Sequence, residues 1–208
     1  MEKKTEGNVL LEKNMERIYC RVAGRKRMGK RIEAMPTEHH LDMIVYYYLR
    51  LDISREEYLS VAVTNSNLES WGMTKRALKK LAWANTMRDQ PAIFQPLDEI
   101  LINEETQPLN SDKKLFLLSN AVKNLGAVCI FYPDFLKRVG EKINSDFYLL
   151  PSSIHECLIL KKEADLKVSS LREMVRTINR TELQEQDILT DSVYLYSREE
   201  EKLMIDNS

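Results

Sequence analysis

The sequence predicts an α+β fold in which a mixed, mainly antiparallel sheet carries helices packed mostly on one of its faces. Two observations lead to this prediction. Residues 41–51 and 58–64 are short runs rich in tyrosine and β-branched side chains, which is typical of strands. Residues 171–178 place apolar side chains three and four positions apart, which is the spacing of an amphipathic helix.

Composition and length indicate an ordinary globular protein. The chain has 208 residues, of which 43% are hydrophobic and 30% charged, so it can bury a core without disulfides or metals. We expect residues 1–16 to form a flexible N-terminal extension and residues 17–208 to form a single α+β domain. The formal net charge of −1 provides no overall attraction to nucleic acid or acidic lipid.

The cysteines and the apolar runs indicate a cytoplasmic protein without a membrane partner. Cys20, Cys129 and Cys157 lie far apart within apolar runs, as expected for reduced core residues. No window approaches the 18 or so apolar residues of a transmembrane helix. The first residues lack the apolar segment of a signal peptide.

Three strands are predicted in the N-terminal half. Residues 17–22 alternate so that Ile18, Cys20 and Val22 share one face. Residues 41–51 and 58–64 are predicted to pair as an antiparallel hairpin around the turn residues between them.

Two helices are predicted after this hairpin. Ser66 and Glu69 have capping-box spacing, which predicts a short helix that ends at Gly72. Thr74 is predicted to cap a longer helix that runs to about Met87.

The middle of the chain is predicted to be a connection followed by a strand and a helix. Residues 88–113 contain several prolines, and Pro96 is expected to open a short helix among them. Residues 115–119 predict a buried strand, whereas residues 126–131 fit either a strand or the opening of the next helix. Pro133 is predicted to begin an amphipathic helix.

The C-terminal third is predicted to be organised around residues 144–160. Apolar residues 147–150 and 154–160 are interpreted as buried strand segments that meet at a Pro-Ser-Ser corner. Ser170 and Glu173 predict a capping box at the start of the helix over residues 171–178. Residues 192–196 and 202–205 predict a final hairpin.

The corner also contains the residues with the most reactive side chains. His155 and Glu156 interrupt an apolar run, and Ser152 and Ser153 precede them. A hydrolase would use a serine as nucleophile and His155 as base, with a carboxylate such as Asp134 or Asp146 brought from elsewhere.

Two features oppose the hydrolase hypothesis. The sequence lacks a G-x-S-x-G elbow, and on a strand Ser153 and His155 share one face while Glu156 takes the other. We therefore prefer a structural latch, in which the hydroxyls satisfy the turn and the charged groups pair across the sheet. No residue is assigned as catalytic, and Cys157 is expected to be a buried, inert thiol.

A basic segment offers the second functional hypothesis. The segment from Arg21 to Arg31 contains many cations and no acid. It could contact phosphates, with the candidates Arg25, Lys26, Arg27, Lys30 and Arg31. The segment has no aromatic residue for base stacking, so a solvated surface is the preferred interpretation. The same holds for the lysines and arginine of residues 75–80.

Adjacent histidines raise the possibility of a metal site, which we do not predict. His39 and His40 lie between Glu38 and Asp42, but neighbouring residues of a strand point to opposite faces. No metal and no cofactor is expected.

Several stretches resemble an uncharacterised bacterial family that is classed as a domain of unknown function. They are LPSSIHE at residues 150–156, VYYYLRLD at 45–52 and VTNSNLESWGMT at 63–74, followed by a helix at 77–85. The resemblance covers roughly residues 18–205, and members of that family usually carry additional sequence before the region that matches Ile18. It implies no activity, cofactor or catalytic residue.

The preferred function is therefore a non-catalytic cytoplasmic module that binds another protein. A hydrolase centred on His155 and a nucleic-acid-associated protein using the basic segment remain the alternatives.

Overall fold

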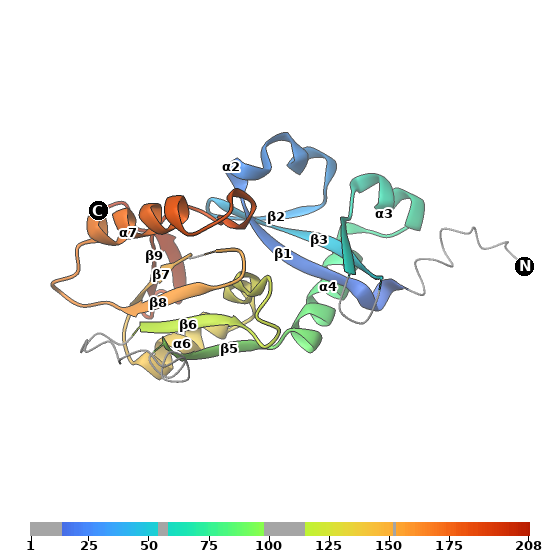
Figure 1. Cartoon of the computed structure of the whole chain (residues 1–208). Coiled ribbons are helices and arrows are strands. Elements are labelled where there is room, and N and C mark those ends of the chain that lie inside the picture. The colour runs from blue at the N-terminus through green and yellow to red at the C-terminus, as the bar shows by residue number, and fades with distance from the viewer. Residues whose placement is uncertain (1–13, 54–57, 98–114, 152) are drawn as a thin grey trace, which may run out of the picture. The chain divides into compact units, whose positions relative to one another are not determined.

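The computed structural model describes residues 14–53, 58–97, 115–151 and 153–208 (Figure 1). The contacts within the chain cluster into two compact units, residues Met1–Pro91 and Ala92–Ser208. Each unit has its own antiparallel sheet. The single domain that the sequence suggests for residues 17–208 stays a prediction. Residues 1–13 of the expected N-terminal extension lie outside the described part, and Met15 and Glu16 belong to a 3₁₀ turn.

The first unit is built on a four-stranded sheet. Strand β3 is its centre, with β1 on one side and both β2 and β4 on the other, and every pairing is antiparallel. The strands are β1 (Ile18–Gly24), β2 (Thr37–His40), β3 (Met43–Asp52) and β4 (Tyr58–Ala62). The helical elements are η1 (Met15–Arg17), α2 (Arg25–Met28), η2 (Gly29–Ala34), α3 (Asn65–Trp71) and α4 (Lys75–Asp89). The predicted strands and hairpin of this half are confirmed.

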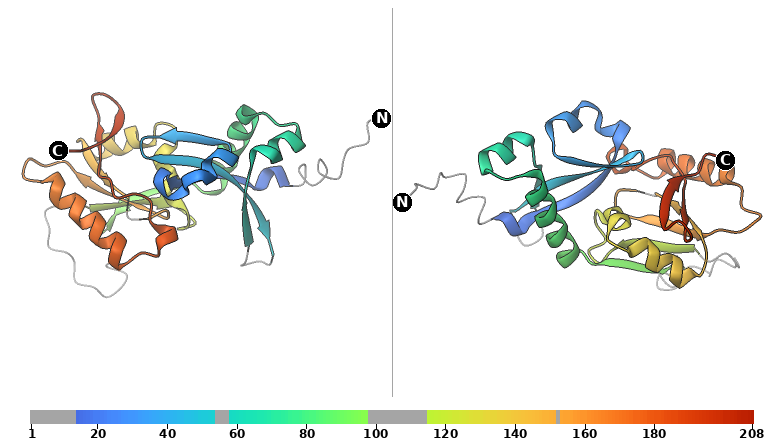
Figure 2. Two further views of the ribbon diagram at one scale, coloured as in Figure 1. Left: turned by 90° about the horizontal axis from the view of Figure 1, so that it is seen from above. Right: turned by 180° about the vertical axis from the view of Figure 1, so that it is seen from behind.

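Helical elements cover both faces of this sheet. Helix α4 lies on one face, and the α2–η2 segment lies on the other, as the two views in Figure 2 also show. Side chains on the α4 face include Glu38 of β2, whose carboxylate accepts a hydrogen bond from the indole N–H of Trp83 at 2.7 Å. Its neighbour His39 points to the opposite face because side chains alternate along a strand.

Local capping explains where the two helices of this unit begin. The short helix α3 starts two residues earlier than predicted, because Thr64 and Asn67 form the capping box instead of Ser66 and Glu69. Gly72 ends α3 in the left-handed conformation with φ of 61°, as predicted. The Thr74 hydroxyl caps α4, also as predicted, by accepting the Ala77 N–H.

The second unit is built on a six-stranded sheet in the order β10-β9-β7-β8-β6-β5. Its strands are β5 (Ala92–Pro96), β6 (Leu115–Asn120), β7 (Phe147–Leu150), β8 (Cys157–Lys161), β9 (Tyr194–Ser197) and β10 (Lys202–Ile205). Its helical elements are η4 (Gly126–Phe131), α6 (Phe135–Ile143), α7 (Val168–Thr181) and η5 (Glu185–Asp187). Strand β5 was not predicted, and Pro96, which was expected to open a short helix, is instead the last residue of this strand. The residues that follow, 98–114, lie outside the described part.

Helices lie on both faces of this sheet as well. Helix α7 packs Leu171 and Val175 against Tyr148, Leu150 and Leu160 of the central strands. Helix α6 lies against the opposite face, because a side chain at its Gly140 would meet the ring of Tyr196. The capping box predicted at Ser170 and Glu173 is wrong, since α7 begins at Val168 without a side-chain cap.

The predicted α+β class is confirmed. All strand pairings among the described residues are antiparallel, and they form two sheets with helices on both faces of each. The predicted core cysteines are buried and unpaired. Residues 126–131, for which the sequence allowed a strand or a helix, form the 3₁₀ element η4.

Candidate functional site

The corner between β7 and β8 is a tight turn. The N–H of Ser153 donates to the carbonyl of Glu156 at 3.2 Å, and the Ser153 hydroxyl accepts the N–H of His155 at 3.0 Å. The strand interpretation of residues 154–156 is therefore wrong, and β8 begins only at Cys157. Serine hydroxyls compete with ladder bonding in this way, and Pro151 has no N–H to offer to a ladder.

His155 is held through its ring and its backbone. Its Nδ1 accepts the N–H of Leu125 at 3.1 Å, and its Nε2 lies 3.5 Å from a carboxylate oxygen of Asp187. The carbonyl of His155 accepts the hydroxyl of Ser119 at 2.8 Å. Because Nδ1 acts as an acceptor, the neutral ring carries its proton on Nε2, facing Asp187. Both ring nitrogens are thus engaged within the protein.

Gly126 allows the corner to approach the first turn of η4. A methyl group on Gly126 would lie 2.7 Å from the carbonyl oxygen of His155 and 2.5 Å from the N–H nitrogen of Asn120. Two further hydrogen bonds join the corner to its neighbours, since Ala127 donates to the carbonyl of Ile154 at 3.2 Å and Ile154 donates to that of Asp187 at 2.8 Å. The corner is therefore bonded to both η4 and η5.

Glu156 and Cys157 have the environments of buried groups. Burial raises the pKa of the Glu156 carboxyl, and the nearby His155 opposes this shift. Burial also raises the pKa of the Cys157 thiol strongly, so the thiol stays protonated. Ser152 lies outside the described residues. The carboxylate beside His155 comes from Asp187, which the sequence analysis did not consider, and not from Asp134 or Asp146.

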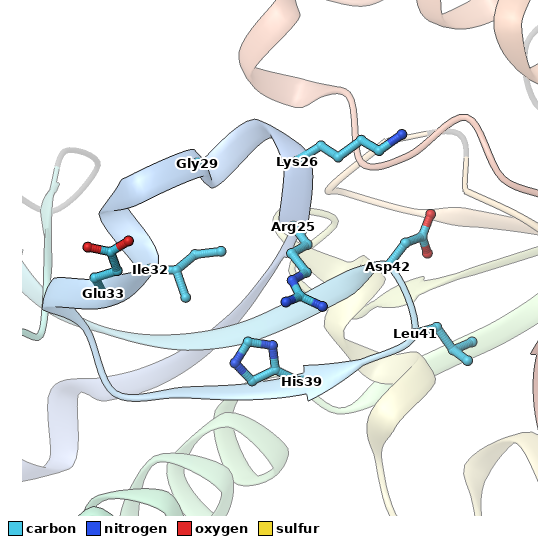
Figure 3. A pocket seen from close by; sticks show the side chains of 8 residues that line it. All are labelled: Arg25, Lys26, Gly29, Ile32, Glu33, His39, Leu41 and Asp42. Carbon is cyan, nitrogen blue, oxygen red and sulfur yellow. The ribbon is translucent and has the colours of Figure 1, made fainter.

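The basic segment folds into α2 and η2, beside a pocket of about 610 Å³ (Figure 3). The side chains of Arg25 and His39 point toward one another across it, whereas Lys26 points away. Glu33 and Asp42 add two carboxylates to the lining. The pocket has the size of a small-molecule site and could hold a small anion between Arg25 and His39. Because both cations and carboxylates line the pocket, its electrostatic potential is not uniformly positive.

The candidate phosphate-binding residues are exposed but do not join the second basic region. All five side chains, Arg25, Lys26, Arg27, Lys30 and Arg31, are exposed. The cations of residues 75–80 belong to α4, on the other face of the sheet. Lys79 forms an ion pair with Glu38. The two basic regions therefore form no continuous ridge.

The carboxylate of Glu38 is held in place by neighbouring side chains and has a structural role. Tyr47 and Trp83 both donate to one of its carboxylate oxygens at 2.7 Å, and Lys79 pairs with the other. Burial tends to raise the pKa of this carboxyl, but these three donors outweigh it and hold the pKa below its usual value. No cluster of three or more His, Cys, Asp or Glu side chains within the described ranges is arranged to hold a metal ion.

The β3–β4 hairpin exposes an apolar surface. On β4, Leu59 and Val61 are 57% and 51% exposed. They lie directly opposite Leu51 and Leu49 of β3, so the four side chains share one face. We call these four residues, Leu49, Leu51, Leu59 and Val61, the apolar strip. Helix α4 buries the start of β3 on this face, as Val45 and Tyr47 are nearly inaccessible, but it leaves Leu59 and Val61 exposed and Leu49 and Leu51 half-buried.

The two outer edges of this sheet differ in how their backbone is satisfied. At β1, the Thr86 hydroxyl accepts the N–H of Cys20 at 2.8 Å, and the Asn85 amide donates to the carbonyl of Ile18 at 3.0 Å. Both α4 side chains are buried, so this edge is closed. At β4, by contrast, no described strand pairs with the outer edge.

The register shows which backbone groups of β4 face outward. Because Cys20 and Ile18 direct their backbone groups to α4, their partners Tyr47 and Leu49 direct theirs to the far side of β3. There the Tyr47 carbonyl accepts the N–H of Val63 at 2.9 Å.

The same alternation continues along β4. Val61 and Leu59 bond to β3, and the residues between and beside them present their N–H and C=O groups to the outside. These outward residues are Tyr58, Ser60 and Ala62. None of the five residues of β4 is charged or proline, although such residues commonly protect an edge.

The edges of the second sheet carry such protection. Strand β5 ends at Pro96, which lacks an N–H, and the four-residue strand β10 begins with Lys202. The outer edge of β4 thus lacks the proline and the lysine that stand at the edges of the second sheet.

Comparison with known proteins identifies the family. The model of the Family of unknown function (DUF5688) matches residues 2–198, and the chain belongs to this family. No curated protein and no solved structure matches the chain. Within the described residues, no helix combines the length and apolar character needed to span a membrane.

Proposed function

We propose that this member of the family is a non-catalytic cytoplasmic interaction module that binds a protein by strand addition to β4. The observation that supports the proposal is the outer edge of β4, which is uncharged, pairs with no strand among the described residues and is flanked by the exposed side chains of Leu59 and Val61. An extended segment can hydrogen-bond to such an edge and place alternate side chains on its neighbours.

The energetics favour an extended partner. The outward N–H and C=O groups of Ser60 and Ala62 can bond to an added strand, and a hydrogen bond contributes about 1 kcal/mol net. Covering Leu59 and Val61 adds apolar burial at roughly 25 cal/mol per Å². The hydrogen bonds are lost if the partner is helical, because a helix uses its own backbone groups.

Amide hydrogen exchange tests the proposal directly. Extended peptides with alternating apolar residues should slow exchange of the Ser60 amide, which faces outward, without changing that of Val61, which faces β3. Val61→Lys should abolish peptide binding, and Val122→Lys, at a position that is 56% exposed in the second unit, serves as the matched control. If no peptide binds and Ser60 exchanges freely under all conditions, the proposal is wrong.

The hydrolase alternative has less support. It needs an imidazole nitrogen free to accept a proton, whereas Nδ1 of His155 accepts the Leu125 N–H and Nε2 faces Asp187. It would gain support from ester hydrolysis by the purified chain that is lost in both Ser153→Ala and His155→Ala variants that remain folded.

The nucleic-acid alternative rests on the exposed cations of α2 and η2. Phosphate binding by these residues should weaken steeply as salt increases. We expect little binding of duplex or single-stranded nucleic acid at physiological ionic strength. A sub-micromolar complex that disappears when Arg25, Lys26, Arg27, Lys30 and Arg31 are all changed to alanine would support this alternative instead.

A further inference from the structure

We infer that the pocket beside α2 and η2 binds a small organic acid by its carboxylate, between Arg25 and His39 (Figure 3). The apolar part of the acid would lie against Ile32 and Leu41, which also line the pocket. This inference goes beyond the proposed function and does not depend on it. The pocket lies on the α2–η2 face of the sheet, whereas the apolar strip lies on the face that carries α4.

The side chain of Arg25 is the first observation behind the inference. It points toward His39 across the pocket, yet its guanidinium has no hydrogen bond or ion pair with any described residue. Glu33 and Asp42 line the same pocket, but neither forms an ion pair with it. A guanidinium without a protein partner can bind a carboxylate through two parallel N–H···O bonds.

His39 supplies a second donor from the opposite wall. Its ring faces Arg25 from β2. Among the described residues, only the Thr37 hydroxyl comes within hydrogen-bond distance of this ring, 3.5 Å from Nε2. Since an imidazole has two ring nitrogens, the other one is available to a ligand. His155 differs in this respect, because both of its nitrogens are engaged.

The carboxylates of the lining limit the charge of the ligand. Glu33 and Asp42 contribute two negative charges, and Lys26 points away from the pocket. A monoanion can be bound by Arg25 and His39 alone. A phosphate dianion would bring a second negative charge beside the two carboxylates, which repel it. The lining therefore favours a monocarboxylate over a phosphate group.

The pocket is held open at both ends by hydrogen bonds. The N–H of Arg25 donates to the carbonyl of Asp42 at 2.8 Å, which ties the start of α2 to the turn between β2 and β3. The amide of Asn65 donates to the carbonyl of Glu33 at 3.1 Å, which ties the end of η2 to α3. The enclosed volume of about 610 Å³ suits a small ligand, and a pocket already formed costs little to order on binding.

Leu41 is a further observation that points to a ligand. It is one of the two residues between β2 and β3, and its φ of 57° lies in the left-handed region, which is costly for leucine. Its side chain lines the pocket and is 43% exposed, so burial in the core does not explain a leucine at this position. An apolar contact with a ligand would explain it, because strained residues cluster at ligand sites.

Titration of the full chain with benzoate, followed by NMR of the histidine rings, tests the inference. The chain has three histidines, so the ring signal of His39 can be assigned by its loss in His39→Gln. Benzoate should shift this signal until it saturates, with a dissociation constant on the order of 1 mM, as for ligands of this size. The signal of His155, in the second unit, should stay unchanged.

Two arginines of α2 distinguish the pocket from a general attraction of anions to exposed cations. Arg25→Gln should weaken benzoate binding by about tenfold, because it removes the charged donor. Arg27→Gln is the matched control, since Arg27 is an exposed cation of the same helix that does not line the pocket. Both variants should keep the melting temperature of the parent chain. Equal weakening by both would overturn the inference.

Two related compounds test the charge of the ligand. Benzamide, which is uncharged, should bind more weakly than benzoate by about tenfold. Phenyl phosphate, which is mostly a dianion at pH 7, should also bind more weakly than benzoate. Benzamide binding as tight as that of benzoate would overturn the role of the carboxylate. Tighter binding of phenyl phosphate would overturn the choice of a monocarboxylate and favour the nucleic-acid alternative.

Leu41→Gly tests the apolar contact. It should weaken benzoate binding by about threefold, because it removes apolar surface from the pocket. The melting temperature should stay close to that of the parent chain, since relief of the left-handed conformation offsets the lost contacts. Unchanged binding would overturn the contact with Leu41. If benzoate at any concentration leaves the His39 signal unshifted, the whole inference is wrong, and the proposed function is unaffected.

Discussion

The corner before β8 and the outer edge of β4 are opposites in how their polar groups are used. At the corner, Ser153 and His155 carry chemistry that suggests a site, yet the Ser153 hydroxyl and the His155 ring bond to the backbone of His155 and Leu125 and to Asp187. At β4, Leu59, Ser60 and Val61 have no side chain that suggests a site, yet the backbone of Ser60 faces outward, where no described strand lies beside it.

This difference shows that binding capacity depends on what a group's neighbours leave unsatisfied. A histidine whose two nitrogens are engaged has little capacity left for a ligand. A backbone edge without a neighbouring strand keeps all of its capacity, whatever its side chains are. Four substitutions, given from the largest expected effect to the smallest, test the two sides of this comparison.

Gly126→Ala should disrupt the corner most strongly. Its methyl group would collide with the backbone of Asn120 and His155, so the corner and η4 would have to separate. We expect a loss of about 3 kcal/mol in the free energy of unfolding, measured by urea denaturation. The matched control is Gly140→Ala in α6, where the methyl group meets only the flexible end of Arg198 and the ring of Tyr196. An equal effect of both substitutions would contradict the close approach at the corner.

Thr86→Val should open the protected edge of β1. The substitution keeps the side-chain shape but removes the oxygen that accepts the N–H of Cys20 in a fully buried position. A buried donor without a partner costs about 1–3 kcal/mol, so we expect a loss of about 2 kcal/mol. Thr181→Val provides the control, because its hydroxyl bonds the Thr177 carbonyl at the exposed end of α7. A stability equal to that of the parent chain would show that α4 does not protect the edge.

His155→Ala should destabilise the protein moderately. The N–H of Leu125 loses its acceptor, and the ring no longer bridges to Asp187. Because the His155 side chain is 36% exposed, water can replace part of the lost bonding, and we expect about 1 kcal/mol. Thermal melts and the peptide-binding assay check this together. A variant with lower stability and unchanged peptide binding supports the latch, whereas unchanged stability with lost binding would place His155 in a ligand site.

Glu156→Gln should have the smallest effect, and it should depend on pH. Since burial raises the pKa of Glu156 in the folded protein, the folded state binds a proton more readily than the unfolded state does. Ionising Glu156 therefore lowers stability as the pH rises through the unfolded-state pKa of about 4.3 toward the higher folded-state value. Glu156→Gln should remove this decrease, changing stability at pH 7 by well under 1 kcal/mol because the group is only half-buried. Urea denaturation between pH 4 and pH 7 measures it. A steeper decrease in the variant would contradict the raised pKa.

The sequence by itself predicted the elements whose signals are local. Alternation in residues 17–22 and 41–51 predicted β1 and β3, because a strand that is buried on one face needs an apolar residue at every second position. Thr74 predicted the start of α4, since a capping hydroxyl acts on an N–H only three residues away. The family resemblance also came from contiguous residues.

Only the tertiary structure decided which groups are satisfied, because that depends on residues far apart in the chain. In the sequence, Asn85 and Thr86 look like ordinary helix residues. Only the fold places them against the edge of β1, where they bond to its backbone. His155 lies 30 positions after Leu125, whose N–H occupies its ring, and 32 positions before Asp187. No local pattern encodes such a pairing, and equally none shows that the outer edge of β4 pairs with no described strand.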